Sequence, residues 1–237
     1  MYEVVVLKPG YATWVGPTQQ HADGTITLVK GPKLIIVDTG GPWNKRFLQA
    51  ALRKHGVRAD AVDFLVCTHG HSDHTGNNNL FPNATVILSY DVCQGDLYTF
   101  HDFQHGQPYT IDDDVRVIPT PGHTHQDITV MARTPDGVVA ITGDLFESAD
   151  DLTDDNLWRS FSEFPDLQAR SREHVLSQAD FIVPGHGPMF RVKDRRVVHS
   201  ATPSTPDRKL LWYILVPLLI TIVGGILLML VTGQYHW

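Results

Sequence analysis

Hydrophobic residues up to position 193 recur with two spacings, one typical of strands and one of helices. In residues 43–55 the apolar side chains fall on one helical face, and Gly56 ends the pattern. A second helical pattern covers residues 166–179 and is entered through Pro165. Runs rich in Val, Ile, Leu and Thr predict strands over residues 2–7, 25–30, 33–38, 61–67, 84–89, 115–120, 128–133, 138–142 and 181–184. Strands and helices alternate in both halves, which predicts an α/β fold with sheets in the middle and helices outside.

Polar stretches separate these elements. Residues 68–79 and the acidic residues 148–156 are expected to be loops. Residues 90–114 are polar and irregular, and we expect a long loop there, beside a functional site. The chain before the apolar tail is long enough for one compact domain with a substantial core, to which we assign residues 1–193.

The C-terminal tail has a different composition. Of the 23 residues from 210 to 232, 15 are Leu, Ile or Val and none is charged. A helix of this length reaches about 35 Å, enough to cross a hydrocarbon core. Aromatic residues stand at both ends, as at membrane interfaces. We predict a C-terminal transmembrane helix over 210–232, joined through a linker over 194–209; a buried core helix is the alternative.

Four basic residues, Arg195, Arg196, Arg208 and Lys209, precede the apolar segment, and only five residues follow it. Because positive charge accumulates on the cytosolic side of a span, we predict a single-pass membrane protein. Its C-terminal tail would be the anchor, and its folded domain would face the cytosol.

The formal net charge is −7, and all of it lies outside the apolar tail. The domain therefore lacks the broad basic surface that drives non-specific nucleic-acid binding. Any nucleic-acid substrate needs a local basic patch. The candidates for such a patch are listed here, with an ordinary solvated face as the alternative interpretation: Arg170, Arg172, Arg191, Lys193, Arg195 and Arg196.

The polar segment 68–74 carries the strongest chemical signal. His69, His71, Asp73 and His74 stand at i, i+2, i+4 and i+5, directly after an apolar strand. On a helix this spacing would scatter the side chains around the axis. In an extended turn, His69 and His71 face one metal ion while Asp73 and His74 reach a neighbouring one.

Three further strand ends offer ligands of the same kind. Two Pro-Gly-His sequences, ending at His123 and His186, each follow a predicted strand, and Gly143-Asp144 ends another. We expect these side chains to meet at one rim of the sheet. The candidate metal ligands are His69, His71, Asp73, His74, His123, Asp144 and His186.

The other histidines are interpreted as ordinary core or surface residues. Three of them, His101, His105 and His125, are left open as residues that line the cleft. The remainder are His21, His55, His174, His199 and His236.

His-x-His-x-Asp-His, followed by Pro-Gly-His, Gly-Asp and Gly-His, resembles the metallo-β-lactamase superfamily over residues 38–186. The resemblance implies an αββα sandwich with two metal sites. His69, His71 and His123 would hold the first metal ion. Asp73, His74 and His186 would hold the second, with Asp144 bridging both.

Further expectations follow from the same resemblance. Asp38 looks like the buried carboxylate that orients a ligand. Five imidazoles and two carboxylates suit two zinc ions, with iron or manganese as alternatives. Cysteine occupies a ligand position in many antibiotic-degrading members, whereas only N and O ligands occur here, so we do not expect a β-lactamase.

Longer stretches, 35–43, 67–82, 143–147 and 183–192, are similar to one branch of the superfamily. Members of that branch are regarded as metal-dependent endoribonucleases that act at the 3′ end of histone pre-mRNA. They are regarded as homodimers of the cytosol and nucleus. The resemblance implies RNA as a substrate, a homodimer, and that location as the alternative to a membrane anchor.

Two cations that share Asp144 would activate a water for hydrolysis, with Asp73 accepting or returning a proton. This chemistry suits a phosphodiester, a thioester or a lactone. We therefore predict a metal-dependent hydrolase, with RNA cleavage as the leading hypothesis. A thioesterase, a glyoxalase-II-like enzyme or a lactone hydrolase at a membrane is the alternative, and a catalytically idle metal-binding protein is a third hypothesis.

Overall fold

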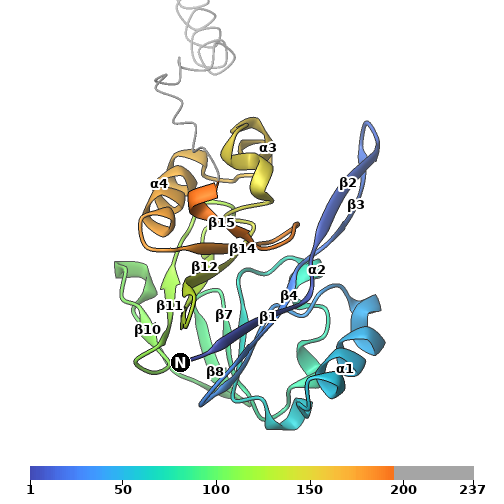
Figure 1. Ribbon diagram of the computed structural model, residues 1–237, viewed down its shortest axis with the longest axis vertical. Helices are drawn as coiled ribbons and strands as arrows, with labels where there is room; N and C mark the ends of the chain where they lie inside the picture. Colours follow the sequence, from blue (N-terminus) through green and yellow to red (C-terminus); the bar gives the residue numbers. More distant parts are fainter. Residues whose placement is uncertain (195–237) are drawn as a thin grey trace, which may run out of the picture. The chain divides into compact units, whose positions relative to one another are not determined.

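Two β-sheets lie face to face in the computed structural model, which describes residues 1–194 (Figure 1). The first sheet contains, in spatial order, β1 (Glu3–Lys8), β4 (Ile26–Lys30), β5 (Leu34–Val37), β6 (Phe64–Cys67), β7 (Thr85–Leu88), β8 (Asp91–Gln94) and β9 (Leu97–Tyr98). The second contains β10 (Tyr109–Thr110), β11 (Val115–Pro119), β12 (Ile128–Thr134), β13 (Gly137–Gly143), β14 (Phe181–Pro184) and β15 (Phe190–Arg191).

The space between the sheets is filled by branched aliphatic side chains. Val37, Val66 and Ile87 come from the first sheet, and Val130 and Ile141 from the second, and all belong to one buried cluster. Strands that are buried on both faces have nearly continuous apolar sequences, as β5 and β6 do. This explains why strand prediction succeeds for the centre of both sheets.

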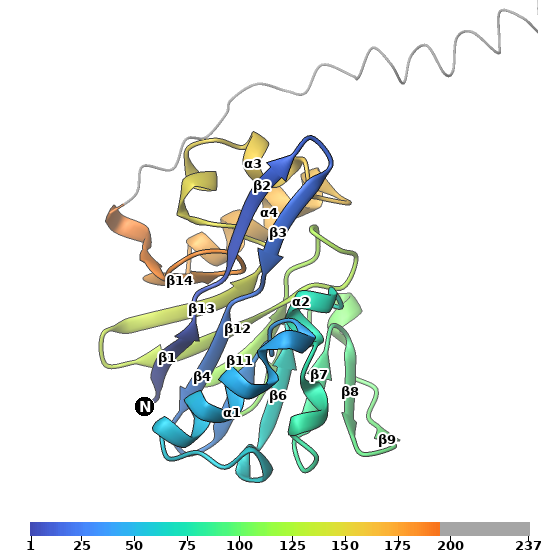
Figure 2. The ribbon, with the colours of Figure 1, turned by 90° about the vertical axis from the view of Figure 1, so that its right-hand side faces the viewer.

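The outer face of each sheet is covered by a helix (Figure 1, Figure 2). Helix α1 (Lys45–Lys54) buries Leu48 and Leu52 against the first sheet, and each contributes about 1.5–3 kcal/mol by leaving water. Helix α4 (Pro165–Leu176) buries Val175 against Ile182 of the second sheet. The four layers confirm the predicted αββα sandwich.

A two-stranded hairpin stands apart from both sheets. It consists of β2 (Tyr11–Gly16) and β3 (Gln19–Asp23), and it extends toward the end of the domain that carries α3 (Asn156–Arg159) and α4 (Figure 1, Figure 2). Every residue from Tyr11 to Val15 is exposed. Because no face of β2 is buried, its sequence lacks the alternation that identifies a strand, and we did not predict the hairpin.

Short elements occur where the sequence predicts loops. The expected long loop over residues 90–114 is wrong, because β8, β9 and β10 lie within it. Residues 68–79 contain the helical turn α2 (Ser72–Thr75) and the start of η3 (Asn78–Leu80), and the predicted strand 61–67 is shorter in the structure, because β6 begins at Phe64. The remaining short helices are η1 (Pro42–Asn44), η2 (Ala59–Ala61), η4 (Phe103–His105), η5 (Ala149–Leu152) and η6 (Val192–Asp194).

Strand direction gathers the candidate ligands at one edge. Strands β13 and β14 are parallel neighbours, and β11 runs in the same direction because two antiparallel pairings separate it from β13. Their carboxyl ends therefore share an edge of the second sheet. Strands β5 and β6 are parallel in the first sheet, so Asp38 and Thr68 emerge side by side. The predicted common rim is built by both sheets rather than one.

The prediction of a C-terminal transmembrane helix as part of the fold class requires correction. No helix within residues 1–194 is long and apolar enough to cross a membrane. The longest of these helices, α4, has 12 residues and reaches about 18 Å, whereas a hydrocarbon core is about 30 Å thick. The predicted span, 210–232, and all but the first residue of the predicted linker, 194–209, lie outside the described residues. We therefore restrict the fold class to the sandwich and withdraw the tail-anchored membrane location.

Candidate metal centre

Asp38 positions the turn that carries four of the predicted ligands. Its Oδ1 accepts a hydrogen bond from the Thr68 backbone amide at 2.8 Å, and its Oδ2 accepts one from the Thr68 hydroxyl at 2.9 Å. Nδ1 of His74 lies 2.7 Å from the same Oδ2. With Nδ1 engaged, the free Nε2 of His74 faces the other ligands, which is the orienting contact expected of a buried carboxylate. The backbone of Asp38 is left-handed, with φ 57°.

The second sheet presents its three ligands from turns at the ends of β11, β13 and β14. Asp144 follows β13 directly, and His186 follows β14 by two residues. The turn of His123 is closed by Asp127, whose Oδ2 accepts from the amides of Gly122 at 3.1 Å and Thr124 at 2.7 Å. The backbone of the His123 turn is therefore fixed by a carboxylate that is not one of the predicted ligands.

His69, His71, His123 and Asp144 form the first ligand group, in which one atom of each lies within 4.8 Å of the others. His71 Nδ1 is 2.9 Å from His69 Nε2 and 3.1 Å from His123 Nε2. Asp144 Oδ2 lies 3.5 Å from His69 Nε2 and 3.4 Å from His123 Nε2. These distances between ligand atoms are those expected when the atoms bind the same metal ion.

Asp73, His74 and His186 form the second group. Asp73 Oδ2 lies 3.9 Å from His74 Nε2 and 3.8 Å from His186 Nε2. Asp144 joins the two groups, because its Oδ1 is 3.2 Å from His74 Nε2 and its Oδ2 is 3.3 Å from His186 Nε2. The structure thus brings all seven predicted ligands together, in the two sets that the resemblance implies.

Buried polar atoms without partners test whether these residues suit metal ions. Within residues 1–194, His74 Nε2, Asp144 Oδ1 and His123 Nδ1 are buried without a hydrogen-bond partner. An unsatisfied buried polar atom costs about 1–3 kcal/mol. A divalent cation held between His74 Nε2 and Asp144 Oδ1 would satisfy both. The residues therefore fit a pair of cations that prefer N and O ligands.

Burial and the two carboxylates control the charges in the site. Burial lowers the pKa of His69 well below its usual value, aided by the neighbouring His74. Burial would also lower the pKa of His74, but Asp144 and Asp38 outweigh it and raise that pKa well above the usual value. Asp144 likewise raises the pKa of His186 to about 9, against the effect of burial. The site thus combines neutral imidazoles with imidazoles paired to carboxylates.

Glu147 is a half-buried carboxyl beside both groups that we did not predict. Its Oε1 lies 3.9 Å from His123 Nδ1, and its Oε2 lies 3.8 Å from His186 Nε2. Together with Asp144 and His186 it forms a third set of potential ligands. The sequence feature that could have identified Glu147 as a site residue is its position three residues after Asp144.

Arg172 was wrongly included in the candidate basic patch for nucleic-acid binding. Its guanidinium is buried, and it donates to Asp151 Oδ1 at 3.1 Å and to the Leu145 carbonyl at 2.8 Å. Arg170 and Arg191 are exposed. Arg195 and Arg196 lie outside the described residues. Arg172 therefore stabilises the loop after β13 instead of presenting charge to a substrate.

Of the three histidines left open, only His125 lies beside the site. It is exposed, two residues after His123, and its ring lies 5.6 Å from that of Phe164. His101 instead bonds to the Gln107 carbonyl, and His105 pairs with Asp102 in the η4 turn. These two keep the interpretation of ordinary residues.

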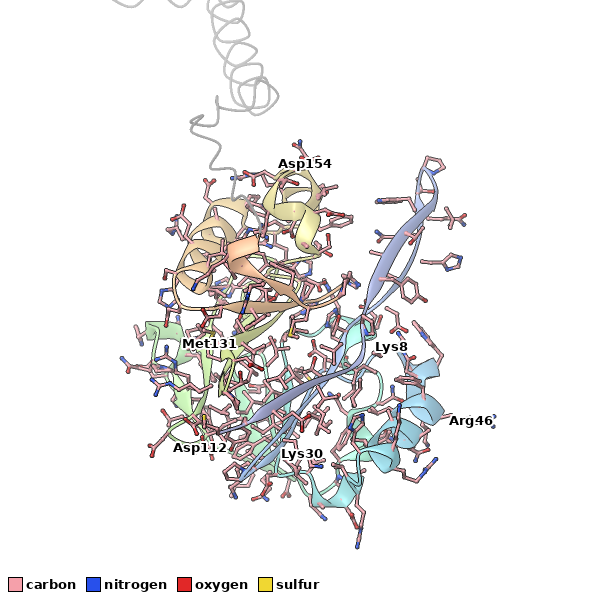
Figure 3. All side chains as sticks on the ribbon, in the orientation of Figure 1. Lys8, Lys30, Arg46, Asp112, Met131 and Asp154 are labelled. Carbon is pink, nitrogen blue, oxygen red and sulfur yellow. The ribbon has the colours of Figure 1, made fainter. Side chains whose placement is uncertain are left out.

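The base of the β2–β3 hairpin contacts the second ligand group. The Gly24 amide donates to the Asp73 carbonyl at 3.2 Å, and His186 Nδ1 lies 3.2 Å from the Tyr11 carbonyl. Lys8, labelled in Figure 3 where β1 meets the hairpin, pairs with Asp23 at 2.6 Å. The hairpin is therefore a wall of the site, although its sequence gave no sign of one.

An αββα sandwich with two ligand groups at the rim of both sheets defines a class: the metal-dependent hydrolases. Residues 22–186 match the Metallo-beta-lactamase superfamily. The chain belongs to this superfamily, as the sequence motifs led us to expect.

Relatives and solved structures agree with this assignment. The chain is 44% identical to metallo-beta-lactamase domain-containing protein 1 of Xenopus laevis over 194 residues, 81% of this chain and 82% of the relative. It is 41% identical to the Homo sapiens protein of the same name, with the same coverage. A putative metallo-beta-lactamase of Thermotoga maritima has a TM-score of 0.59 at 20% identity, covering 80% of this chain and 99% of that one. AidC, a dizinc quorum-quenching lactonase, has a TM-score of 0.57 at 20% identity, with 79% and 81% covered.

Proposed function

We propose that this protein is a dizinc endoribonuclease that hydrolyses RNA phosphodiester bonds. The observation that carries the proposal is Asp144, whose carboxylate lies between the two ligand groups: Oδ1 faces His74, and Oδ2 lies close to both His123 and His186. Two cations joined in this way suit in-line displacement at phosphorus, because one assists the attacking oxygen and the other the leaving oxygen. The choice of RNA rests on the resemblance of the sequence motifs to a branch of the superfamily whose members are regarded as endoribonucleases.

His69, His71 and His123 would hold one zinc ion, Asp73, His74 and His186 the other, with Asp144 shared. Bound zinc would supply an activated water at neutral pH and Lewis-acid stabilisation of developing charge. Asp38 keeps His74 in the orientation that ligation needs. Asp73, with a side chain 19% exposed, is the ligand placed to exchange a proton with solvent. Glu147 lies beside the His123 ring, with Oε1 3.9 Å from His123 Nδ1, and is a further potential ligand.

A carboxylic-ester, thioester or lactone hydrolase is the second candidate. The hairpin wall favours it, because residues 12–22 contain no Lys or Arg to attract phosphate. A neutral wall suits an uncharged acyl group as well as a nucleobase. AidC, which shares the fold, is described as a dizinc lactonase.

The test uses the full chain purified with its bound metal ions. Single-stranded RNA, an acyl thioester and an acyl-homoserine lactone are each supplied with and without chelator, and metal content is measured by mass spectrometry. We expect chelator-sensitive RNA cleavage and close to two zinc ions per chain. His71→Ala should lose at least 100-fold in kcat/KM, whereas His105→Ala, an exposed histidine away from the site, should match the wild type. Turnover of the thioester or the lactone without RNA cleavage would overturn the proposal in favour of the second candidate.

The homodimer implied by the resemblance remains a prediction. Sedimentation of the full chain at several concentrations would test it.

A further inference from the structure

Exposed aromatic rings surround the metal centre on two sides. Trp14 on β2 and Phe161, between α3 and α4, stack with ring centroids 6.2 Å apart and planes inclined by 22°. Trp14 is 57% exposed and Phe161 37% exposed. Phe164 and His125 form a second, edge-to-face pair nearby, with planes inclined by 61°. We call these four residues the aromatic rim.

Both sides of the aromatic rim are fixed to ligand turns. On one side, the amides of Glu163 and Phe164 donate to the carbonyls of His123 and Gly122 at 3.1 and 2.9 Å. On the other side, the Tyr11 carbonyl lies against His186. Trp14 is three residues further along β2, which places it roughly 10 Å from that contact. The rim therefore lies within the reach of a substrate bound at the metals.

The charge of the rim restricts what it can bind. Residues 12–22 of the hairpin carry no Asp, Glu, Lys or Arg. On the opposite side, Arg159 lies over the Trp158 ring and pairs with Asp155 at 3.6 Å. The hairpin wall thus offers a flat π-face rather than cations for phosphates. Recognition of single-stranded RNA relies on such faces, because every base can stack on an aromatic ring.

We propose that Trp14 and Phe161 form a stacking subsite for a nucleobase within two nucleotides of the scissile phosphate. The inference rests on the proposed function, RNA cleavage, and specifies where the enzyme would hold a base of that RNA. Stacking is tolerant of base identity, so the subsite selects unpaired RNA over duplex rather than a sequence.

A panel of single-stranded RNA oligonucleotides, each lacking the base at one position, tests the subsite on the full-length enzyme. For the wild type, we expect one abasic position to raise KM by about 5- to 150-fold, the range of base–aromatic stacking. Trp14→Ala should raise KM for the intact RNA by a similar factor, and the same abasic position should then have no further effect. Trp14→Phe should restore most of the sensitivity, since a stacking face remains.

Two controls separate stacking from damage to the site. Phe100→Ala removes an aromatic side chain that is 100% exposed in the segment after β9, and it should leave KM unchanged. Zinc content of the Trp14→Ala protein should equal that of the wild type. If the wild type cleaves RNA but no abasic position couples to Trp14, the subsite is refuted and the proposed function stands. If the wild type cleaves no RNA, the proposed function and the subsite both fail.

Discussion

Replacing Arg172 with methionine should destabilise the domain more than any exposed arginine replacement. The Arg172 guanidinium donates to both oxygens of Asp151, to the Asp151 carbonyl and to the Leu145 carbonyl. It also lies 4.1 Å from the Phe146 ring centroid and 4.6 Å from that of Trp158. Arg172→Met keeps an apolar stem between these rings but leaves Asp151, which is fully buried, without its cation.

The magnitude follows from the unpaired carboxylate. Removing one partner of a buried ion pair costs about 3–5 kcal/mol, which is a large share of a total stability of about 5–15 kcal/mol. At about 2–4 °C per kcal/mol for a domain of this size, Tm should fall by roughly 6–20 °C. Burial already raises the pKa of Asp151 despite Arg172, so protonation of Asp151 should reduce the loss at acidic pH.

Urea unfolding of the full chain, followed by far-UV circular dichroism at pH 8, provides the measurement. Arg170→Met is the matched control, because Arg170 is exposed on the same helix; its effect should be within about 0.5 kcal/mol. The double variant Arg172→Met with Asp151→Asn should recover part of the loss, since no buried charge is left unpaired. If Arg172→Met lies within about 1 kcal/mol of Arg170→Met, then Arg172 is not the anchor of the loop that follows Asp144.

Four further predictions address the turns and the metals. Gly122 has φ 152°, and a Cβ there would meet the Gln168 Cα at 2.2 Å, so Gly122→Ala should lose about 2 kcal/mol or more in the same unfolding assay. Burial raises the pKa of Asp127 from 3.8 to about 7, although bonds from Thr124 oppose it. As pH rises, the Asp127 carboxyl loses its proton at a lower pH in the unfolded chain than in the folded one. The free energy of unfolding of the wild type should therefore fall by up to about 4 kcal/mol between pH 4 and 7, and by less in Asp127→Asn; equal pH slopes for the two proteins would contradict this. Chelation should lower Tm, and zinc at about 1,000 times its Kd should restore about 4 kcal/mol; an unchanged melting curve would argue against tight binding by the folded state. With about two phosphate contacts, RNA affinity should fall about 7-fold between 50 and 200 mM salt, and a far steeper fall would reveal a basic surface outside the hairpin.

Prediction from the sequence succeeded where the signal was local. Each ligand follows a strand directly or within a short turn, so the order of strand, Gly or Pro-Gly, and His or Asp already describes a strand end. The central strands are apolar because both of their faces are covered, and their identification needed no knowledge of their neighbours. The grouping of ligands into two sets came from the resemblance, and spacing alone could not have provided it.

Prediction failed where a residue's environment is set by distant parts of the chain. Both residues of β9 are exposed, so this edge strand has the polarity of a loop. Arg172 is separated from Asp151 by 21 positions, and a helical pattern does not reveal that an arginine is buried. Glu147 resembles a solvated glutamate until the fold brings His123 beside it.

The division of the ligands between sheets couples metal binding to stability. His69, His71, Asp73 and His74 belong to the first sheet, while His123, Asp144 and His186 belong to the second. Backbone bonds such as Ile128 N to Thr68 O at 2.9 Å and Thr25 N to Gly185 O at 2.8 Å join the sheets at this rim. A cation bound by ligands from both sheets would therefore cross-link them, and its binding energy would become folding energy. Conversely, any substitution that separates the sheets, even one on the far side of the inter-sheet core, should weaken metal affinity. Val130→Ala in the core, measured for zinc affinity as well as for stability, would test this coupling. Unchanged affinity in a variant destabilised by about 1–3 kcal/mol would show that the rim is rigid on its own.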